Sequence, residues 1–192
     1  MRGNRQVPSH ITTVRAFFGL PLPDEHRAQL AAFLAQSGAA APQFRWVSAP
    51  NLHLTLRFIG TIERELIGSI ADRLADSRLS SFELGLGELG TFKRGRLVRV
   101  AWLGLTDGVE AAKELAGRIE AECARAGLEA EQRPFQPHLT LARARNRFGG
   151  VLPPLPPAPR LESWRADELV LYESRLSPKG SIYQPLRVLA LE

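Results

Sequence analysis

A four-residue sequence, His-Leu-Thr-Leu, occurs twice in this chain, at residues 53–56 and 138–141. The two copies lie 85 positions apart, a little under half of the 192 residues. Each copy belongs to a segment in which polar and apolar residues alternate, which is typical of a β-strand that is buried on one face. A proline precedes each copy, at Pro50 and Pro137. The repeat therefore predicts two matching halves, each containing one such strand.

Side chains two positions apart in a strand point to the same face of a sheet. His53 therefore shares a face with Thr55, and His138 shares a face with Thr140, whereas the leucines point to the other face. A single His-x-Thr segment is more often only a polar strand face. Two matched copies favour a site, because halves packed about an approximate twofold axis bring both histidines to one substrate.

Imidazole titrates near neutral pH, so one histidine can accept a proton while the other donates one. This pair suits in-line attack on a phosphodiester, in which one histidine activates water and the other protonates the leaving oxygen. The hydroxyl groups of Thr55 and Thr140 would donate hydrogen bonds to the nonbridging phosphate oxygens. No metal or other cofactor is needed. A metal site on His53 and His138 is the alternative chemistry, but the chain has one cysteine, no His-Glu-x-x-His segment and no carboxylate-rich segment nearby.

The rest of the chain predicts a mixture of strands and helices. Apolar residues at helical spacing indicate helices over 24–36, 62–74 and 109–119. Alternating or short apolar segments indicate eight strands, at 14–20, 44–47, 53–59, 82–86, 98–102, 138–142, 169–171 and 186–191. We expect an α+β fold with two pseudo-symmetric lobes, mostly antiparallel sheets around a central cleft, and helices on the outside.

The first thirteen residues show no periodicity and are expected to form a flexible tail, with residues 14–192 as a single two-lobed domain. The chain has 44% hydrophobic and 23% charged residues, which excludes disordered and coiled-coil classes. No stretch approaches the ~20 apolar residues of a membrane span, and the polar start lacks the apolar part of a secretory signal. A cytoplasmic monomer with no obligatory protein partner is expected.

The net charge of +5 fits either an anionic partner or simple solubility. The single cysteine, Cys123, excludes an internal disulfide and is predicted to be a buried structural thiol. Arginines at 94, 96, 99, 143, 145 and 147 offer contacts to the phosphates of an RNA backbone, or form a solvated loop. The remaining histidines, His10 and His26, are predicted to be solvated surface residues.

Three further residues are candidates for binding substrate. Arg57 is an even number of positions from His53, so it is expected to lie on the same face of the strand and to meet a phosphate there. Arg143 is an odd number of positions from His138, so it needs a bend or bulge in the strand to reach the same face. Phe17 is a candidate for stacking on a nucleobase, although an aromatic residue on a central strand is more often part of the core.

The paired motifs resemble those that define the 2H phosphoesterase superfamily. Residues 51–58 and 135–143 are similar to its LigT branch, the bacterial and archaeal RNA 2′,3′-cyclic phosphodiesterases, historically called 2′-5′ RNA ligases. The resemblance extends from residues 15–18, similar to the opening strand of the branch, to residues 168–174, similar to its penultimate strand. It covers nearly all of the chain after Val14.

The resemblance implies a two-lobed α+β fold without a metal cofactor, acting on RNA ends or nucleotides that bear a 2′,3′-cyclic phosphate. It implies that His53 is the proton donor to the leaving 3′ oxygen and His138 the proton acceptor that activates water. Thr55 and Thr140 match the phosphate-holding threonines, and Arg143 is favoured as a phosphate contact. Ligation through a 2′-5′ linkage would be the same chemistry with a 2′ hydroxyl as the attacking or leaving group. The alternative is a module that binds RNA ends or nucleotide phosphates without turnover.

Overall fold

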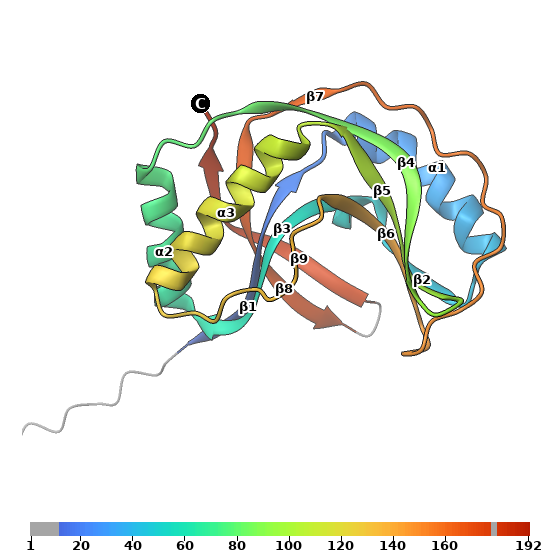
Figure 1. Ribbon diagram of the computed structural model, residues 1–192, viewed down its shortest axis with the longest axis horizontal. Helices are drawn as coiled ribbons and strands as arrows, with labels where there is room; N and C mark the ends of the chain where they lie inside the picture. The colour runs from blue at the N-terminus through green and yellow to red at the C-terminus, as the bar shows by residue number, and fades with distance from the viewer. Residues whose placement is uncertain (1–11, 178–179) are drawn as a thin grey trace, which may run out of the picture.

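The computed structural model describes residues 12–177 and 180–192. Within them the chain forms three α-helices, one short 3₁₀ helix and nine strands (Figure 1). In chain order these are β1 (Thr13–Pro21), α1 (Asp24–Ala40), β2 (Phe44–Trp46), η1 (Ala49–Asn51), β3 (His53–Glu63), α2 (Arg64–Asp76), β4 (Phe82–Arg94), β5 (Leu97–Asp107), α3 (Val109–Arg125), β6 (His138–Ala144), β7 (Trp164–Ala166), β8 (Glu168–Ser177) and β9 (Gly180–Ala190).

The strands form one continuous sheet, in which every pair of neighbours is antiparallel. The order is β7-β4-β5-β6-β3-β1-β8-β9, and β2 pairs with the end of β6. The two strands that carry the repeated sequence, β3 and β6, are neighbours at the centre and pair at Leu54 and Leu139. The two halves extend in opposite directions from this pair, so the repeat lies where the halves meet.

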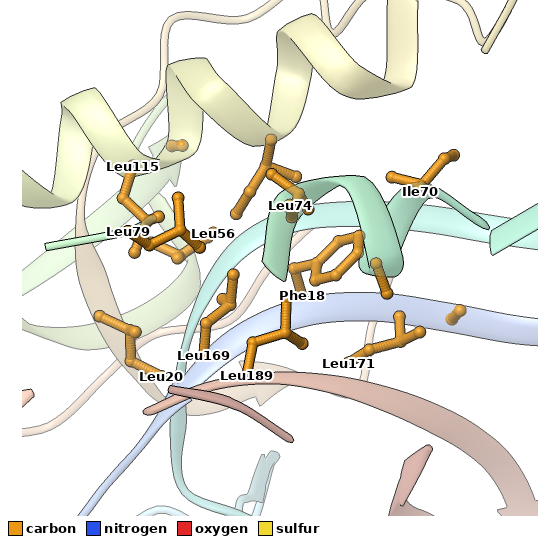
Figure 2. Close-up of a cluster of buried hydrophobic side chains, with 14 of the residues drawn as sticks. Phe18, Leu20, Leu56, Ile70, Leu74, Leu79, Leu115, Leu169, Leu171 and Leu189 are labelled. Atoms are coloured by element: carbon orange, nitrogen blue, oxygen red, sulfur yellow. The ribbon is translucent and has the colours of Figure 1, made fainter. Parts of the chain in front are cut away.

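The leucine face of the sheet is covered by the helices. Leu56 of β3 belongs to a buried cluster with Ile70 of α2 and Leu115 of α3 (Figure 2). Leu139 and Leu141 of β6 pack with Leu30 of α1 in a second cluster. Figure 1 shows α2 and α3 on the left and α1 on the right of the strands. Burial of each leucine side chain is worth about 1.5–3 kcal/mol, so these contacts fix which face points away from the helices.

Several strand boundaries differ from the prediction. β3 continues to Glu63, because Gly60 adopts φ +84° and is accommodated at a register shift opposite Ala16 and Phe17. β8 and β9 form one long hairpin, which the sequence obscures because Pro185 and a register shift interrupt its alternation. β7 (Trp164–Ala166) is the one strand beyond the eight that the sequence predicted.

The prediction for Cys123 is confirmed, whereas that for His26 is wrong. Cys123 lies in the core, and burial raises the pKa of its thiol to about 11. His26 is only 7% exposed, and its Nε2 lies 2.8 Å from the carbonyl oxygen of Glu162. This partner is 136 positions away, so no local pattern reveals that the helix position is covered.

His10 and most of the predicted tail lie outside the described residues, and β1 begins at Thr13. In the described part of the chain, each helix is too short or too polar to cross a lipid bilayer.

Candidate active site

Four polar side chains surround the Leu54–Leu139 pair on the face opposite the helices. β3 and β6 pair at Leu54 and Leu139. If this antiparallel register is continued by one residue on each side, His53 is opposite Thr140 and Thr55 is opposite His138. All four side chains are partly exposed, and they alternate with buried leucines. We call these four residues the histidine quartet. In this register its two histidines are diagonal neighbours, so their imidazole rings lie on the same face of two adjacent strands.

The backbone orients both imidazole rings in the same way. Nδ1 of His53 is 2.8 Å from the carbonyl oxygen of Asn51, and Nδ1 of His138 is 2.7 Å from that of Gln136. A carbonyl oxygen can only accept a hydrogen bond, so Nδ1 carries a proton in both rings. Nε2 is therefore the nitrogen of each ring that is left to exchange a proton with a substrate.

The hydroxyl group of Thr55 lies beside the reactive nitrogen of its own strand. Its Oγ1 is 2.9 Å from Nε2 of His53. When His53 is neutral, Nε2 has a lone pair and accepts this hydrogen bond from the Thr55 hydroxyl. The hydroxyl can rotate from the ring to a phosphate oxygen once His53 is protonated.

Aromatic rings enclose both histidines. The ring centroid of His53 is 4.6 Å from that of Phe17 and 5.0 Å from that of Tyr183. The centroid of His138 is 5.0 Å from that of Phe92 and 6.0 Å from that of Trp102. These rings exclude water from one side of each imidazole and thereby disfavour its charged form.

A glycine on β1 makes room for the first histidine. A Cβ atom on Gly19 would lie 3.0 Å from the carbonyl oxygen of Leu54 and 3.3 Å from Cδ2 of His53. The first of these atoms belongs to the backbone of β3 and cannot move without displacing the strand. Gly19 therefore allows β1 and the imidazole of His53 to approach each other.

The pKa values of both histidines are lowered. Burial is the largest cause and lowers the pKa of His53 to about 4, although the hydrogen bond to the Asn51 carbonyl opposes it. Burial also lowers the pKa of His138, against the effect of the Gln136 carbonyl. The guanidinium of Arg143 lowers the pKa of both rings. One positive charge is therefore close enough to act on both histidines.

Arg143 reaches this face through a β-bulge. Ala101 of β5 pairs with Ala142 and Trp102 pairs with Thr140, so Leu141 has no partner on β5. Leu141 and Ala142 are both fully buried on the helix side, which returns the exposed Arg143 to the face of the quartet. The ion pairs of the described residues include no carboxylate partner for Arg143. Its charge is thus available to an anionic ligand.

A second bulge turns Arg57 away from the quartet. The pairing of β3 with β1 skips Leu56, so Leu56 and Arg57 both turn toward the helices. Nε of Arg57 lies 2.6 Å from a carboxylate oxygen of Glu120 on α3, and Nη1 lies 3.3 Å from Glu131. The expectation that Arg57 faces the phosphate is wrong, because the parity argument assumed an unbroken strand.

Phe17 lies at the site but is not available to a base. Its side chain is 2% exposed, and its ring stacks on Tyr172 at 5.0 Å while contacting His53. It supports the imidazole instead of meeting solvent. Tyr172 and Tyr183 were missed by sequence reasoning, because the β8–β9 hairpin that carries them comes to β1 only in the folded chain.

Two cavities lie away from the quartet. One, of about 580 Å³, includes Arg45 and Arg145 in its lining, and the other, of about 770 Å³, lies around Arg57. Arg45 pairs with Arg143 across β2 and β6, so the two guanidinium groups share a face.

Within residues 12–177 and 180–192, no group of three or more His, Cys, Asp or Glu side chains is placed to hold a metal ion.

Comparison with known proteins finds similar sequences over most of the chain. The model of the "LigT like Phosphoesterase" family matches twice, over residues 20–102 and 103–183, and each match contains one copy of the repeated sequence. An Escherichia coli K12 protein named RNA 2′,3′-cyclic phosphodiesterase is 32% identical over 177 residues, covering 92% of this chain and 96% of the relative. A Methanothermobacter thermautotrophicus protein of the same name is 29% identical, with 93% and 99% covered.

Solved structures show the same fold. A crystal structure of E. coli LigT with 3′-AMP superposes with a TM-score of 0.80 at 32% identity, covering 94% of this chain and 99% of the other. A crystal structure of a Thermus thermophilus protein superposes with a TM-score of 0.77 at 29% identity, with 92% and 97% covered. The predicted α+β fold with antiparallel strands and peripheral helices is confirmed.

Proposed function

This chain belongs to the family of LigT-like phosphoesterases, and we propose that it hydrolyses 2′,3′-cyclic phosphodiester ends of RNA to 2′-phosphomonoesters. The observation that carries the proposal is the diagonal pair of histidines, each with Nε2 free of a backbone partner and each within the field of Arg143. The names of the relatives support the substrate class.

In the proposed reaction, the phosphate lies between the two rings. Nε2 of His138 takes a proton from a water molecule, whose oxygen attacks phosphorus from one side. The bond from phosphorus to the 3′ oxygen breaks on the other side, and Nε2–H of His53 gives that oxygen its proton. The products are a 2′-phosphate and a free 3′ hydroxyl group. The hydroxyls of Thr55 and Thr140 and the guanidinium of Arg143 stabilise the charge on the nonbridging oxygens.

Binding of the substrate favours protonation of His53, the proposed acid. His53 has a pKa of about 4 in the free protein, so it is mostly neutral at neutral pH. An anionic phosphodiester beside the ring favours imidazolium and offsets the opposing charge of Arg143. The Thr55 hydroxyl then turns from Nε2 to a phosphate oxygen. Binding of substrate and protonation of His53 are thus coupled.

The experiment that tests this function is hydrolysis in the presence of a chelator. The protein is incubated with RNA ending in a 2′,3′-cyclic phosphate and excess EDTA, and the product is identified as the 2′- or 3′-phosphate. We expect the 2′-phosphate with an undiminished rate, because the proton transfers use only side chains. Loss of activity in EDTA would support a metal site instead, and tight binding without product would support a phosphate-binding module.

The pH dependence of the reaction should be bell-shaped and displaced to acid pH. The active free protein needs His53 protonated and His138 neutral, and both pKa values are below 6.5, that of His53 being about 4. The maximum of kcat/KM should therefore lie below pH 6.5, with a decline toward neutral pH. In the complex, phosphate charge raises both pKa values, so the alkaline limb of kcat should lie at higher pH than that of kcat/KM. A flat kcat/KM across the imidazole range contradicts the paired acid and base.

Removal of either threonine hydroxyl should slow the chemical step. Thr55→Val or Thr140→Val deletes one donor to the nonbridging oxygens, and kcat is expected to fall by up to about 10²-fold. Thr61→Val is the matched control, since Thr61 is exposed on the same strand as Thr55 but outside the quartet. The measurement is the steady-state kcat of the three variants. If kcat of Thr55→Val and Thr140→Val equals that of the Thr61→Val control, the two hydroxyls have no part in the mechanism.

We also propose that the protein acts as a monomer in the cytoplasm. The quartet and Arg143 all come from one chain, so a second copy is not needed to complete the site. Ligation through a 2′-5′ linkage would use the same groups, with the 5′ hydroxyl of a second RNA attacking phosphorus in place of water. His138 would take the proton of that hydroxyl, and the bond from phosphorus to the 3′ oxygen would break with a proton from His53. Light scattering of the purified protein during turnover measures its molar mass, and the mass of a single chain is expected.

A further inference from the structure

An exposed aromatic ring on the loop after β6 has the guanidinium groups of two arginines over it. Phe148 is 45% exposed, with the guanidinium carbon of Arg147 at 4.6 Å and that of Arg94 at 5.4 Å from its ring centroid. We call these three residues the Phe148 platform. Neither arginine is in an ion pair within the described residues. The platform therefore offers a partly exposed aromatic ring, with two guanidinium groups over it that have no carboxylate partner among the described residues.

The loop that carries the platform is held in place by the sheet. Gly150 and Val98 exchange two backbone hydrogen bonds of 2.9 Å, and Gly149 has φ +106°. A Cβ atom on Gly149 would lie 2.9 Å from Cβ of Leu97 and 2.9 Å from the carbonyl oxygen of Val98. The turn therefore packs directly on β5 and fixes the position of Phe148.

The platform is continuous with the active site through β4. Phe92 of β4 contacts the ring of His138, and Arg94 follows two positions later. The register of β4 and β5 shifts between Phe92 and Lys93, but the unpaired residue, Arg99, belongs to β5, so the alternation of β4 continues. Side chains two positions apart on β4 therefore share a face and are separated by about 6.6–6.8 Å along the strand. Arg94 thus extends the face of the quartet outward from His138, and Phe148 lies beneath its guanidinium.

We propose that the Phe148 platform binds the RNA strand on the 5′ side of the cyclic phosphate and makes the enzyme prefer oligonucleotide ends to cyclic mononucleotides. This inference rests on the proposed function. A terminal nucleotide with a 2′,3′-cyclic phosphate joins the rest of its strand only through its 5′ oxygen, so all other nucleotides leave the quartet in one direction. A base can stack on the exposed part of the Phe148 ring or on the guanidinium planes that lie over it, and such stacking is tolerant of sequence. The positive charge of the two guanidinium groups also fits the backbone phosphates.

The preference for a strand is measured with a length series. The substrates are one 2′,3′-cyclic mononucleotide and single-stranded RNAs of two to six nucleotides that end in the same cyclic nucleotide. For the unaltered protein, kcat/KM should rise with length by about tenfold or more, the effect of one stacked base. A kcat/KM that does not change with length overturns the proposal.

Variants locate the effect. Phe148→Leu should abolish most of the length advantage and leave cleavage of the mononucleotide unchanged. Val188→Ala changes another exposed apolar residue, on β9, and should leave both unchanged. Arg94→Gln should reduce the slope of log affinity against log salt concentration by about 0.7 for the RNAs. Arg125→Gln, an exposed arginine of α3 in a pair with Glu122, is the charge control. A full length advantage in Phe148→Leu overturns the proposal.

Binding separates failure of the platform from failure of the proposed reaction. The probe is a fluorescently labelled hexanucleotide with a 2′,3′-cyclic end, and its anisotropy is measured with each variant. If no variant or parent protein turns the probe over but Phe148→Leu weakens its binding by about tenfold, the platform holds and the hydrolytic function is wrong. If the parent turns over the mononucleotide and Phe148→Leu binds the probe as the parent does, the hydrolytic function holds and the platform is wrong.

Discussion

Replacement of His138 by alanine is expected to reduce kcat for hydrolysis of a 2′,3′-cyclic end by about 10²- to 10⁴-fold. The variant has no group to take the proton of the attacking water. The hydroxyls of Thr55 and Thr140 and the charge of Arg143 remain, so affinity for a 2′-phosphate product should change little. Single-turnover rates together with product affinity test this expectation. A loss of affinity that accounts for the whole effect would make His138 a binding group only.

His53→Ala should lose a similar factor, but for a different reason that a change of leaving group reveals. An alkoxide leaving oxygen needs a proton, whereas a nitrophenolate is a far weaker base and leaves without one. A nitrophenyl phosphodiester should therefore be cleaved by His53→Ala at nearly the rate of the unaltered protein, but not by His138→Ala. Rescue of His138→Ala alone would reverse the assignment of donor and acceptor.

Arg143→Gln should lower kcat/KM by about 10²-fold or more, because it removes the positive charge beside the developing charge on the phosphate. The same substitution should also shift the pH profile. Since Arg143 lowers the pKa of both histidines, its loss should move both limbs of the pH profile to higher pH. A profile that keeps its position while activity falls would mean that Arg143 lies farther from the rings than this structure places it.

Arg57→Gln is the matched control for Arg143. Both arginines are close to a copy of the repeated sequence, but Arg57 is tied to Glu120 and Glu131 on the helix side. The change should leave kcat/KM within about twofold of the parent and lower the free energy of unfolding by about 1–3 kcal/mol, since its partners lose a donor. Chemical denaturation measures the latter. A large loss of activity at constant stability would return Arg57 to the site.

The quartet was predictable because its geometry depends only on the two-residue period of a strand and on burial of the leucines between its members. Leu54 and Leu139 are both buried, and they pair with each other. The same reasoning failed for Arg57, because one residue skipped in the ladder exchanges the faces that follow it. Bulges depend on how neighbouring strands pair, and a strand's own sequence does not reveal them.

The surroundings of the histidines depend on contacts that are distant in sequence. Tyr172 and Tyr183 reach His53 from the last hairpin, and Trp102 reaches His138 from β5. Their effect on the pKa values was therefore not accessible to sequence reasoning. The burial of His26 on α1 likewise depends on a residue distant in sequence, since Nε2 of this histidine lies against the carbonyl oxygen of Glu162. Local period predicts which face a residue takes, whereas tertiary packing decides what covers it.

The most direct measurement is a crystal structure of the protein with a nucleoside 2′-monophosphate, the proposed product. We predict one phosphate between the two rings, with Nε2 of His53 and Nε2 of His138 each within about 2.6–3.2 Å of oxygens on opposite sides of the phosphorus atom. The hydroxyls of Thr55 and Thr140 and the guanidinium of Arg143 should contact the remaining oxygens. A phosphate that is bound elsewhere, or that contacts only one of the two imidazoles, would contradict paired acid and base catalysis at a single phosphorus.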